Sequence, residues 1–210
     1  MLDPTQLLPF AAAALALNLT PGADMTYVIA RSATQGRAAG IAASLGIAAG
    51  SLVHSVLAAV GVSALLQHSE TAFLVVKYAG AAYLLYLAWK AVRAGGKAVA
   101  TDRALARTNL TRVFGEGALT NLLNPKVVLF ILAFLPQFVD PSRGNAAIQI
   151  LLLGAIFNIG GTTVNAIVAC SASMAARALG SSATFGRWLN RLSALVFVGL
   201  AVRLALTERR

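Results

Sequence analysis

The 210-residue sequence has little charge, few acidic residues and almost no cysteine. Charged residues make up only 11% of it, and 7 acidic residues stand against 17 lysines and arginines. Soluble domains carry about 25% charged residues, so an ordinary soluble fold is excluded. The single cysteine, Cys170, excludes an internal disulfide and a cysteine-rich metal site. Phosphate-binding loops and dinucleotide fingerprints are also absent, so we do not expect an ATP-driven pump without a partner subunit.

Long apolar runs dominate the sequence, because hydrophobic residues make up 58% of it. A helix needs about 20 apolar residues to cross a bilayer. We therefore predict an all-α integral membrane protein, in which residues 1–210 form one transmembrane domain of six helices in contact with lipid. The predicted spans are Leu7–Ile29, Ile41–Leu66, Thr71–Val92, Val113–Val139, Ala147–Met174 and Trp188–Leu206.

The basic residues lie between the apolar runs and do not form one stripe. The net charge of +10 could by itself suggest nucleic-acid binding, but this distribution argues against it. Most of the lysines and arginines follow the odd-numbered runs. The positive-inside rule therefore predicts that the loops after the odd-numbered spans are cytoplasmic and that both termini are periplasmic. The terminal pair Arg209-Arg210 favours the opposite orientation in the membrane.

Residues 94–112 form the only long polar and charged stretch, and they divide the six spans three and three. We interpret residues 1–93 and 113–210 as two repeats, because one constant shift in residue number superimposes Pro21 on Pro125 and His54 on Asn158. A unit of three spans is odd, so the second repeat enters the membrane from the opposite side. Inverted repeats of this kind are typical of secondary transporters.

The first and fourth spans are each interrupted by proline, within residues 20–24 and 121–126. Proline has no backbone N–H and glycine weakens a helix, so we predict two broken helices, the first and the fourth. The N-terminus of each second half-helix would present N–H groups to an anionic ligand inside the membrane. The predicted N-caps with their first helical residues are Thr20 with Pro21 and Asn124 with Pro125.

Asp24 and Lys126 are opposite charges just after the two breaks, where ionisable residues pair or face a cavity. A zwitterionic amino acid fits this arrangement, with its carboxylate near Lys126 and its ammonium near Asp24. A structural ion pair between the repeats is the alternative. The predicted substrate-binding residues are Thr20, Pro21, Gly22, Asp24, Asn121, Asn124, Pro125, Lys126 and Asn158.

His54 lies in the middle of the second span, where its imidazole could exchange a proton near physiological pH. We predict that Asp24 and His54 couple transport to protons; a histidine that only hydrogen-bonds across helices is the alternative. Metal-cation efflux through Asp24, His54 and Cys170 is a competing hypothesis with little support, since the three lie on separate spans. A third hypothesis is an intramembrane enzyme that uses His54 and Asp24 for acid–base chemistry, but no activated nucleophile lies near them in the sequence. No resident cofactor or metal is predicted.

Three further features concern helix packing. Glycines crowd the second span, including Gly46, Gly50 and Gly61, and we predict that they allow close packing rather than flexing. Glu116, near the basic stretch, is expected to form an interfacial salt bridge, with a gating role as the alternative. The fifth span is polar on one side and could line a pathway or tie helices together, through Asn158, Thr162, Thr163 and Asn165.

These motifs, in this order, resemble the LysE/RhtB superfamily of bacterial amino-acid exporters. The resemblance covers essentially the whole chain, from residues 20–24 through His54 and the stretch 77–87 to residues 121–130 and 135–138. It implies a multi-pass inner-membrane exporter of amino acids such as homoserine, threonine, leucine, lysine or arginine, driven by protons. The pattern is nearer the homoserine/threonine branch, and homo-oligomer formation stays open. One departure is Ala23, where the family commonly has the second proline of Pro-Gly-Pro.

Overall fold

The computed structural model describes residues 2–68, 70–93 and 108–178, together with residues 191, 194–195, 198–199 and 201–202. These residues contain helices and no strands, which confirms the all-α fold class. The elements are α1 (Pro4–Leu19), α2 (Ala23–Gln35), α3 (Arg37–His68), α4 (Glu70–Arg93), α5 (Leu110–Leu122), α6 (Pro125–Phe134), the 3-10 helices η1 (Leu135–Phe138) and η2 (Pro141–Arg143), and α7 (Ala146–Ala178).

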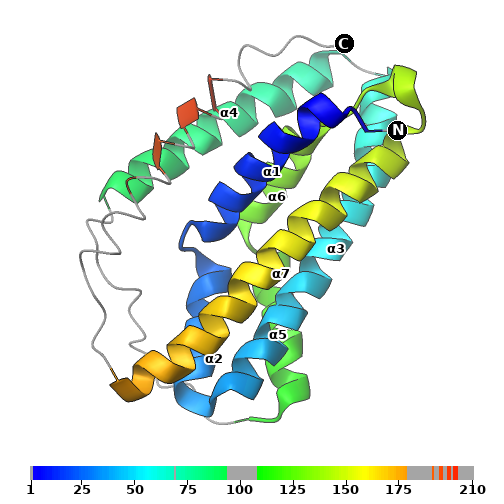
Figure 1. Cartoon of the computed structure of the whole chain (residues 1–210). Coiled ribbons are helices and arrows are strands. Elements are labelled where there is room, and N and C mark those ends of the chain that lie inside the picture. Colours follow the sequence, from blue (N-terminus) through cyan, green and yellow to red (C-terminus); the bar gives the residue numbers. More distant parts are fainter. Residues whose placement is uncertain are drawn as a thin grey trace.

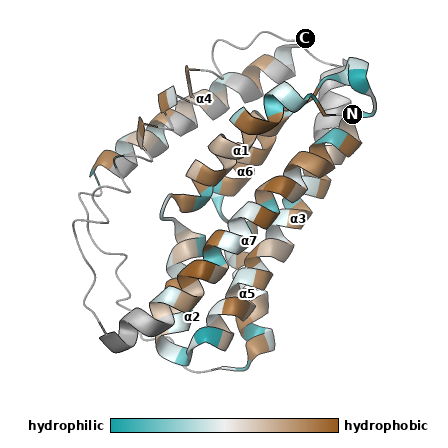
Figure 2. Ribbon diagram, in the orientation of Figure 1, coloured by the Kyte–Doolittle hydropathy of each residue, from teal (hydrophilic) through white to brown (hydrophobic). Residues whose placement is uncertain are grey.

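The helices form an elongated bundle in which α3 and α7 run its full length (Figure 1). Helices α1 and α6 lie side by side in one half of the bundle, α2 and α5 lie in the other half, and α4 runs along one side. We call the end where α2 and α7 finish and α3 and α5 begin the linker end, because α5 follows the basic linker. Figure 2 shows apolar residues over most of the helix surface and more hydrophilic residues at the two ends of the bundle.

The first predicted break is present, but its capping differs from our prediction. α1 ends at Leu19, and Thr20 is the C-cap of this helix: its backbone N–H donates to Ala16 O and Leu17 O, and its hydroxyl also donates to Ala16 O at 2.7 Å. Gly22 is the N-cap of α2, which begins at Ala23. Our prediction of Thr20 as N-cap with Pro21 as first helical residue is therefore wrong, because the Thr20 hydroxyl satisfies a carbonyl at the end of α1 instead.

The second break has the predicted capping. Asn124 is the N-cap of α6, its side-chain oxygen accepts from Lys126 N at 3.1 Å, and Pro125 occupies the first turn. Helix α5 and the segment Pro125–Phe138 meet at an angle of 55°. A proline at the first position of a helix has a favourable φ and lacks only an N–H that would have no intrahelical acceptor. The fourth span is therefore broken where the sequence predicts.

Among the described residues, two helical segments are long and apolar enough to cross a membrane, Arg37–Gly61 and Ala146–Ala172. The bent pair formed by α5 and Pro125–Phe138 is a third candidate span if the two parts cross the membrane together. Helix α1 is apolar but shorter than a span. These segments match the predicted second, fifth and fourth spans. The predicted third span is helical in α4, and most of the sixth, Trp188–Leu206, lies outside the described residues. Six spans in two inverted repeats stay a prediction.

Gly46 and Gly50 bring α3 against α5, as predicted for close packing, whereas Gly61 has no close neighbour among the described residues, so the prediction is wrong for that glycine. A Cβ added to Gly46 would lie 2.0 Å from the Phe114 carbonyl oxygen, and one added to Gly50 would lie 2.8 Å from the Ala118 carbonyl oxygen. A real Cβ essentially never lies this close to a non-bonded heavy atom, so a side chain at either position forces the helices apart. The two glycines therefore fix the position of α5, and with it the position of the second break.

Replacing Gly46 by alanine is expected to lower the free energy of unfolding by about 1–3 kcal/mol, the usual cost of overpacking. Thermal unfolding of the purified protein in detergent measures this loss. Gly61→Ala is the matched control on the same helix, because no atom of the described residues lies within 4 Å of its added Cβ. Equal unfolding temperatures for the two variants would show that α3 and α5 are not packed as closely as described.

Candidate functional site

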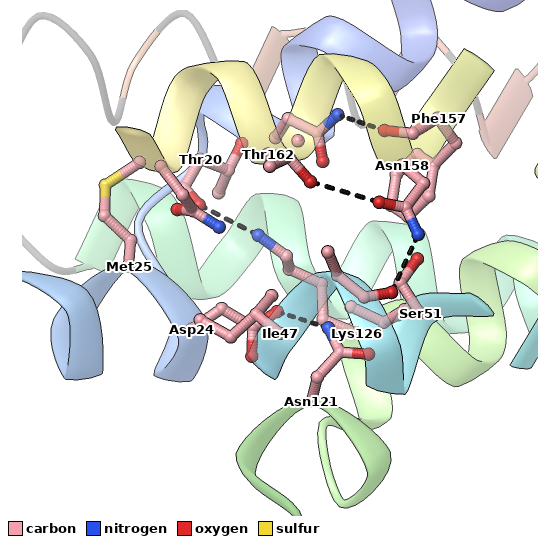
Figure 3. A pocket seen from close by; sticks show the side chains of 15 residues that line it. Thr20, Asp24, Met25, Ile47, Ser51, Asn121, Lys126, Phe157, Asn158 and Thr162 are labelled. Carbon is pink, nitrogen blue, oxygen red and sulfur yellow. Dashed lines mark hydrogen bonds between the residues drawn. The ribbon is translucent and has the colours of Figure 1, made fainter. Parts of the chain in front are cut away.

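A cavity lies between the two helix breaks (Figure 3). Its empty space is about 440 Å³, a figure that includes the open solvent at its mouth. Five parts of the bundle contribute: the end of α1, the start of α2, the middle of α3, the α5–α6 break and the middle of α7. The lining residues are Asn18, Thr20, Asp24, Met25, Ile47, Ala48, Ser51, Asn121, Lys126, Val127, Phe157, Asn158, Gly161, Thr162 and Asn165.

Lys126 reaches from the start of α6 to the end of α1. Its Nζ donates to the carbonyl oxygens of Leu17 at 2.9 Å and Thr20 at 2.8 Å. The last carbonyls of a helix have no intrahelical partner and carry the negative end of the helix dipole, so a cation there is stabilised. The lysine passes beside Gly22, where an added Cβ would make an ordinary van der Waals contact with Nζ at 3.4 Å. An ammonium has three N–H groups, and within the described part of the chain these two carbonyls use two of them, so one is left for a ligand.

Asp24 lies in the first turn of α2, where a negative charge is favoured by the helix dipole. Its Oδ2 accepts from the Asn121 side-chain amide at 2.8 Å, and Asn121 lies near the end of α5. The two charged residues therefore make reciprocal contacts: each follows one break and bonds to the half-helix that precedes the other. None of the ion pairs within 4.0 Å in the described part of the chain joins Asp24 to Lys126.

Several polar atoms at the cavity have no hydrogen-bond partner within the described part of the chain. They are Asp24 Oδ1, Ser51 Oγ and Asn121 Oδ1, each buried. Leaving a buried polar atom unsatisfied costs about 1–3 kcal/mol. These atoms cluster around one cavity, which points to a polar ligand there. Asn124 Nδ2 is also without a partner in the described part of the chain, and its side chain lies beside the Asp24 carboxylate.

His54 does not line the cavity but lies behind Asn121. Its Nε2 is 3.3 Å from the Asn121 carbonyl oxygen, and the Asn121 side chain bonds to Asp24. Asn121 therefore contacts both of the predicted proton-coupling groups.

Asn158 lies in the cavity wall on α7 and ties this helix to α3. Its Nδ2 donates to Ala48 O at 2.8 Å, and its Oδ1 accepts from the Thr162 hydroxyl at 3.1 Å. Asn18 holds α1 to the same helix, because its Nδ2 donates to Phe157 O at 3.2 Å. Both readings of the polar face of this span thus hold in part: Asn158 ties helices together, and it also lines the cavity with Thr162 and Asn165.

Apolar side chains close the bundle on both sides of the cavity. Toward the linker end, Val28, Ala43, Ile47, Val113 and Ala169 pack into one buried layer, and Ile47 also lines the cavity. Toward the opposite end an aromatic cluster continues from the cavity wall, with ring centroids 4.8 to 6.5 Å apart; it consists of Phe10, Phe130, Phe134, Phe138 and Phe157. A ligand in the cavity therefore sits between two apolar barriers.

An ion-pair network lies beyond the apolar layer at the linker end. Arg31 of α2 pairs with Glu116 of α5, which also pairs with Arg112 at 3.0 Å. Arg31 Nε donates to the Tyr27 hydroxyl at 3.2 Å, and its Nη1 donates to Gln35 Oε1 at 2.6 Å. The salt bridge predicted for Glu116 is confirmed. It ties α2 to α5 on the linker side of the cavity.

The structure brings only part of the predicted set to the cavity. Of the nine predicted substrate-binding residues, five line it: Thr20, Asp24, Asn121, Lys126 and Asn158. Pro21, Gly22, Asn124 and Pro125 shape the two breaks. Sequence reasoning missed Asn18, Met25 and Ile47. No group of three histidines, cysteines or acidic residues gathers within the described residues.

Comparison with known proteins gives a consistent result. A model of the LysE type translocator family matches residues 15–208. The chain is 33% identical over 198 residues to an uncharacterized membrane protein of Vibrio cholerae, covering 91% of this chain and 92% of that protein. It is 29% identical over 196 residues to the leucine efflux protein of Salmonella typhimurium, covering 91% of each. No solved structure matches the chain.

Proposed function

We propose that this chain, which belongs to the LysE type translocator family, exports a neutral amino acid across the bacterial inner membrane in exchange for protons. A family of translocators is a family of transporters and not of enzymes. The similarity to a protein named for leucine efflux supports amino-acid export. The observation that carries the proposal is a cavity that presents one carboxylate and one ammonium, both located at helix breaks.

The amino acid binds between the two breaks. Its ammonium group meets the unpartnered Asp24 Oδ1, and its carboxylate accepts from the remaining N–H of Lys126 and from the N–H groups that open α2 or α6. Charge-assisted hydrogen bonds of this kind are about twice as strong as neutral ones. A zwitterion satisfies both charges at once, which a metal cation does not.

Transport proceeds by alternating access, with the basic loops in the cytoplasm and both termini in the periplasm. Opening toward the cytoplasm separates α2 from α5, which requires the Arg31–Glu116 pair to break and the apolar layer beneath it to part. Opening toward the periplasm parts the aromatic cluster instead. The reciprocal contacts of Asp24 and Lys126 support this scheme, since each couples one broken span to the other.

Transport by reconstituted protein tests the function. Proteoliposomes preloaded with each of the natural amino acids in turn are assayed for counterflow of the same labelled amino acid, and then for accumulation driven by an imposed pH gradient. At least one neutral amino acid is expected to show both activities. Counterflow by none of them would refute the proposal, and metal-dependent efflux in the same vesicles would favour the cation alternative.

His54→Gln is expected to separate the two activities. Glutamine can still hydrogen-bond the Asn121 carbonyl oxygen but cannot carry a proton, so counterflow should persist while accumulation driven by the pH gradient falls about tenfold or more. Val60→Ala, a change on the exposed face of the same helix, is the control for insertion and yield. Full gradient-driven accumulation by His54→Gln would show that this histidine does not couple transport to protons.

A further inference from the structure

Asn165 is a buried amide in the cavity wall for which binding of an amino-acid backbone gives no role. Its side chain is 7% exposed and lines the cavity. None of the side-chain hydrogen bonds found in the described part of the chain involves Asn165, whereas Asn158 on the same helix uses both its oxygen and its nitrogen. Its amide lines the cavity and is available to hydrogen-bond a polar group there.

The register of α7 places Asn165 at the linker-end side of the cavity. Asn158, Thr162 and Asn165 are four and then three residues apart, so they share one face of the helix. Asn165 is about 10 Å farther along the axis than Asn158. It precedes by one turn Ala169, which belongs to the apolar layer with Val28 and Ile47. The amide therefore lies just above the apolar floor, in the region where the side chain of a bound amino acid would extend.

Thr162 adds an acceptor on the same face. Its hydroxyl donates to Asn158 Oδ1 at 3.1 Å, so the lone pairs of its oxygen are the part left for a ligand. The Asn165 amide supplies donors and an acceptor. The cavity lining also includes the apolar side chains of Met25, Ile47 and Phe157. The site thus suits a short carbon chain that carries one hydroxyl or amide group.

We propose that Asn165 is a specificity-determining residue that hydrogen-bonds a hydroxyl or amide in the side chain of the cargo, so that the cargo is a neutral polar amino acid. The inference rests on the proposed function, because the charges at Asp24 and Lys126 must hold the amino-acid backbone. An aliphatic side chain such as that of leucine would leave Asn165 unpaired. Sites built to hydrogen-bond a substrate group reject analogues that lack it.

Isosteric pairs of amino acids test the specificity directly. Wild-type counterflow is compared for threonine against valine, homoserine against norvaline, and asparagine against leucine, the members of each pair being similar in shape and differing in the polar group. We expect at least one polar member to be transported about tenfold better than its apolar counterpart. If the apolar members are transported equally well or better, the inference is wrong while the proposed function stands. If none of the six amino acids is transported, the inference that the cargo is a neutral polar amino acid is wrong.

Variants of Asn165 then show whether this residue reads the polar group. Asn165→Leu is expected to abolish the preference within the pair that shows it, by reducing transport of the polar member about tenfold and leaving the apolar member unchanged. Asn165→Ala removes the amide without adding bulk and should act in the same direction, which covers the case in which leucine does not fit. Thr163→Val is the matched control, since the Thr163 hydroxyl is exposed and bonds to Ile159 O. A preference retained in both Asn165 variants would overturn the proposal.

Discussion

Replacing Lys126 by glutamine is expected to reduce amino-acid counterflow at least 100-fold, to the level of empty liposomes. The side chain then loses the positive charge that meets the substrate carboxylate, a loss equivalent to about 3 kcal/mol of binding. Glutamine is polar and can still donate to one of the two carbonyl oxygens at the end of α1, those of Leu17 and Thr20. The change therefore removes charge while leaving part of the helix contact in place.

Lys126→Ala provides the structural comparison. It leaves both α1 carbonyls without the lysine, so we expect lower thermal stability in addition to lost transport. Arg143→Gln is the control for charge, because Arg143 is a partly exposed residue that pairs with Asp3 and Asp140 away from the cavity. If Lys126→Gln transported at the wild-type rate, Lys126 would be a purely structural bridge between the broken spans, and the substrate carboxylate would have to bind elsewhere.

The positions of both breaks could be predicted from the sequence because they depend on local chemistry. Proline removes a backbone donor wherever it stands, so Pro21 and Pro125 interrupt their spans whatever surrounds them. Asn124 was also predictable as an N-cap, since its side chain reaches an N–H only two residues away. The role of Thr20 could not be predicted, because its hydroxyl can bond either to the N–H groups of the following helix or to a carbonyl of the preceding one. Here it bonds to Ala16 O of the preceding helix.

The contacts of the two charges could not be predicted from local patterns. Lys126 bonds to residues 109 and 106 positions away in the sequence, and this distance is closed only because α1 packs beside α6 through Phe10 and Phe130. The sequence indicated that both charges face a common cavity, but not that each would bond to the opposite broken span. Met25 and Ile47 were missed for a related reason, since apolar residues in an apolar span carry no signal that distinguishes cavity from core.

Replacing Asp24 by asparagine is expected to reduce binding of the amino acid about 100-fold or more, because its ammonium group loses the carboxylate that faces it. The substitution preserves shape, and the new amide oxygen can still accept from the Asn121 amide. Binding is measured by the ligand-induced rise in unfolding temperature and by counterflow. Asp140→Asn, in the loop before α7, removes a negative charge outside the cavity and should leave both measurements unchanged.

The double variant Asp24→Asn with Lys126→Gln distinguishes a binding site from a structural ion pair. If the two charges only stabilised each other, each single variant would leave one unpaired charge in the membrane. The double variant would remove that unpaired charge, and transport would recover. The structure favours the opposite result, because each charge has its own partner on the other broken span, Asn121 for Asp24 and the end of α1 for Lys126. The two losses should therefore not rescue each other, and the double variant should be as inactive as each single one. Recovered counterflow would show that the charges serve the scaffold and that the amino acid binds without them.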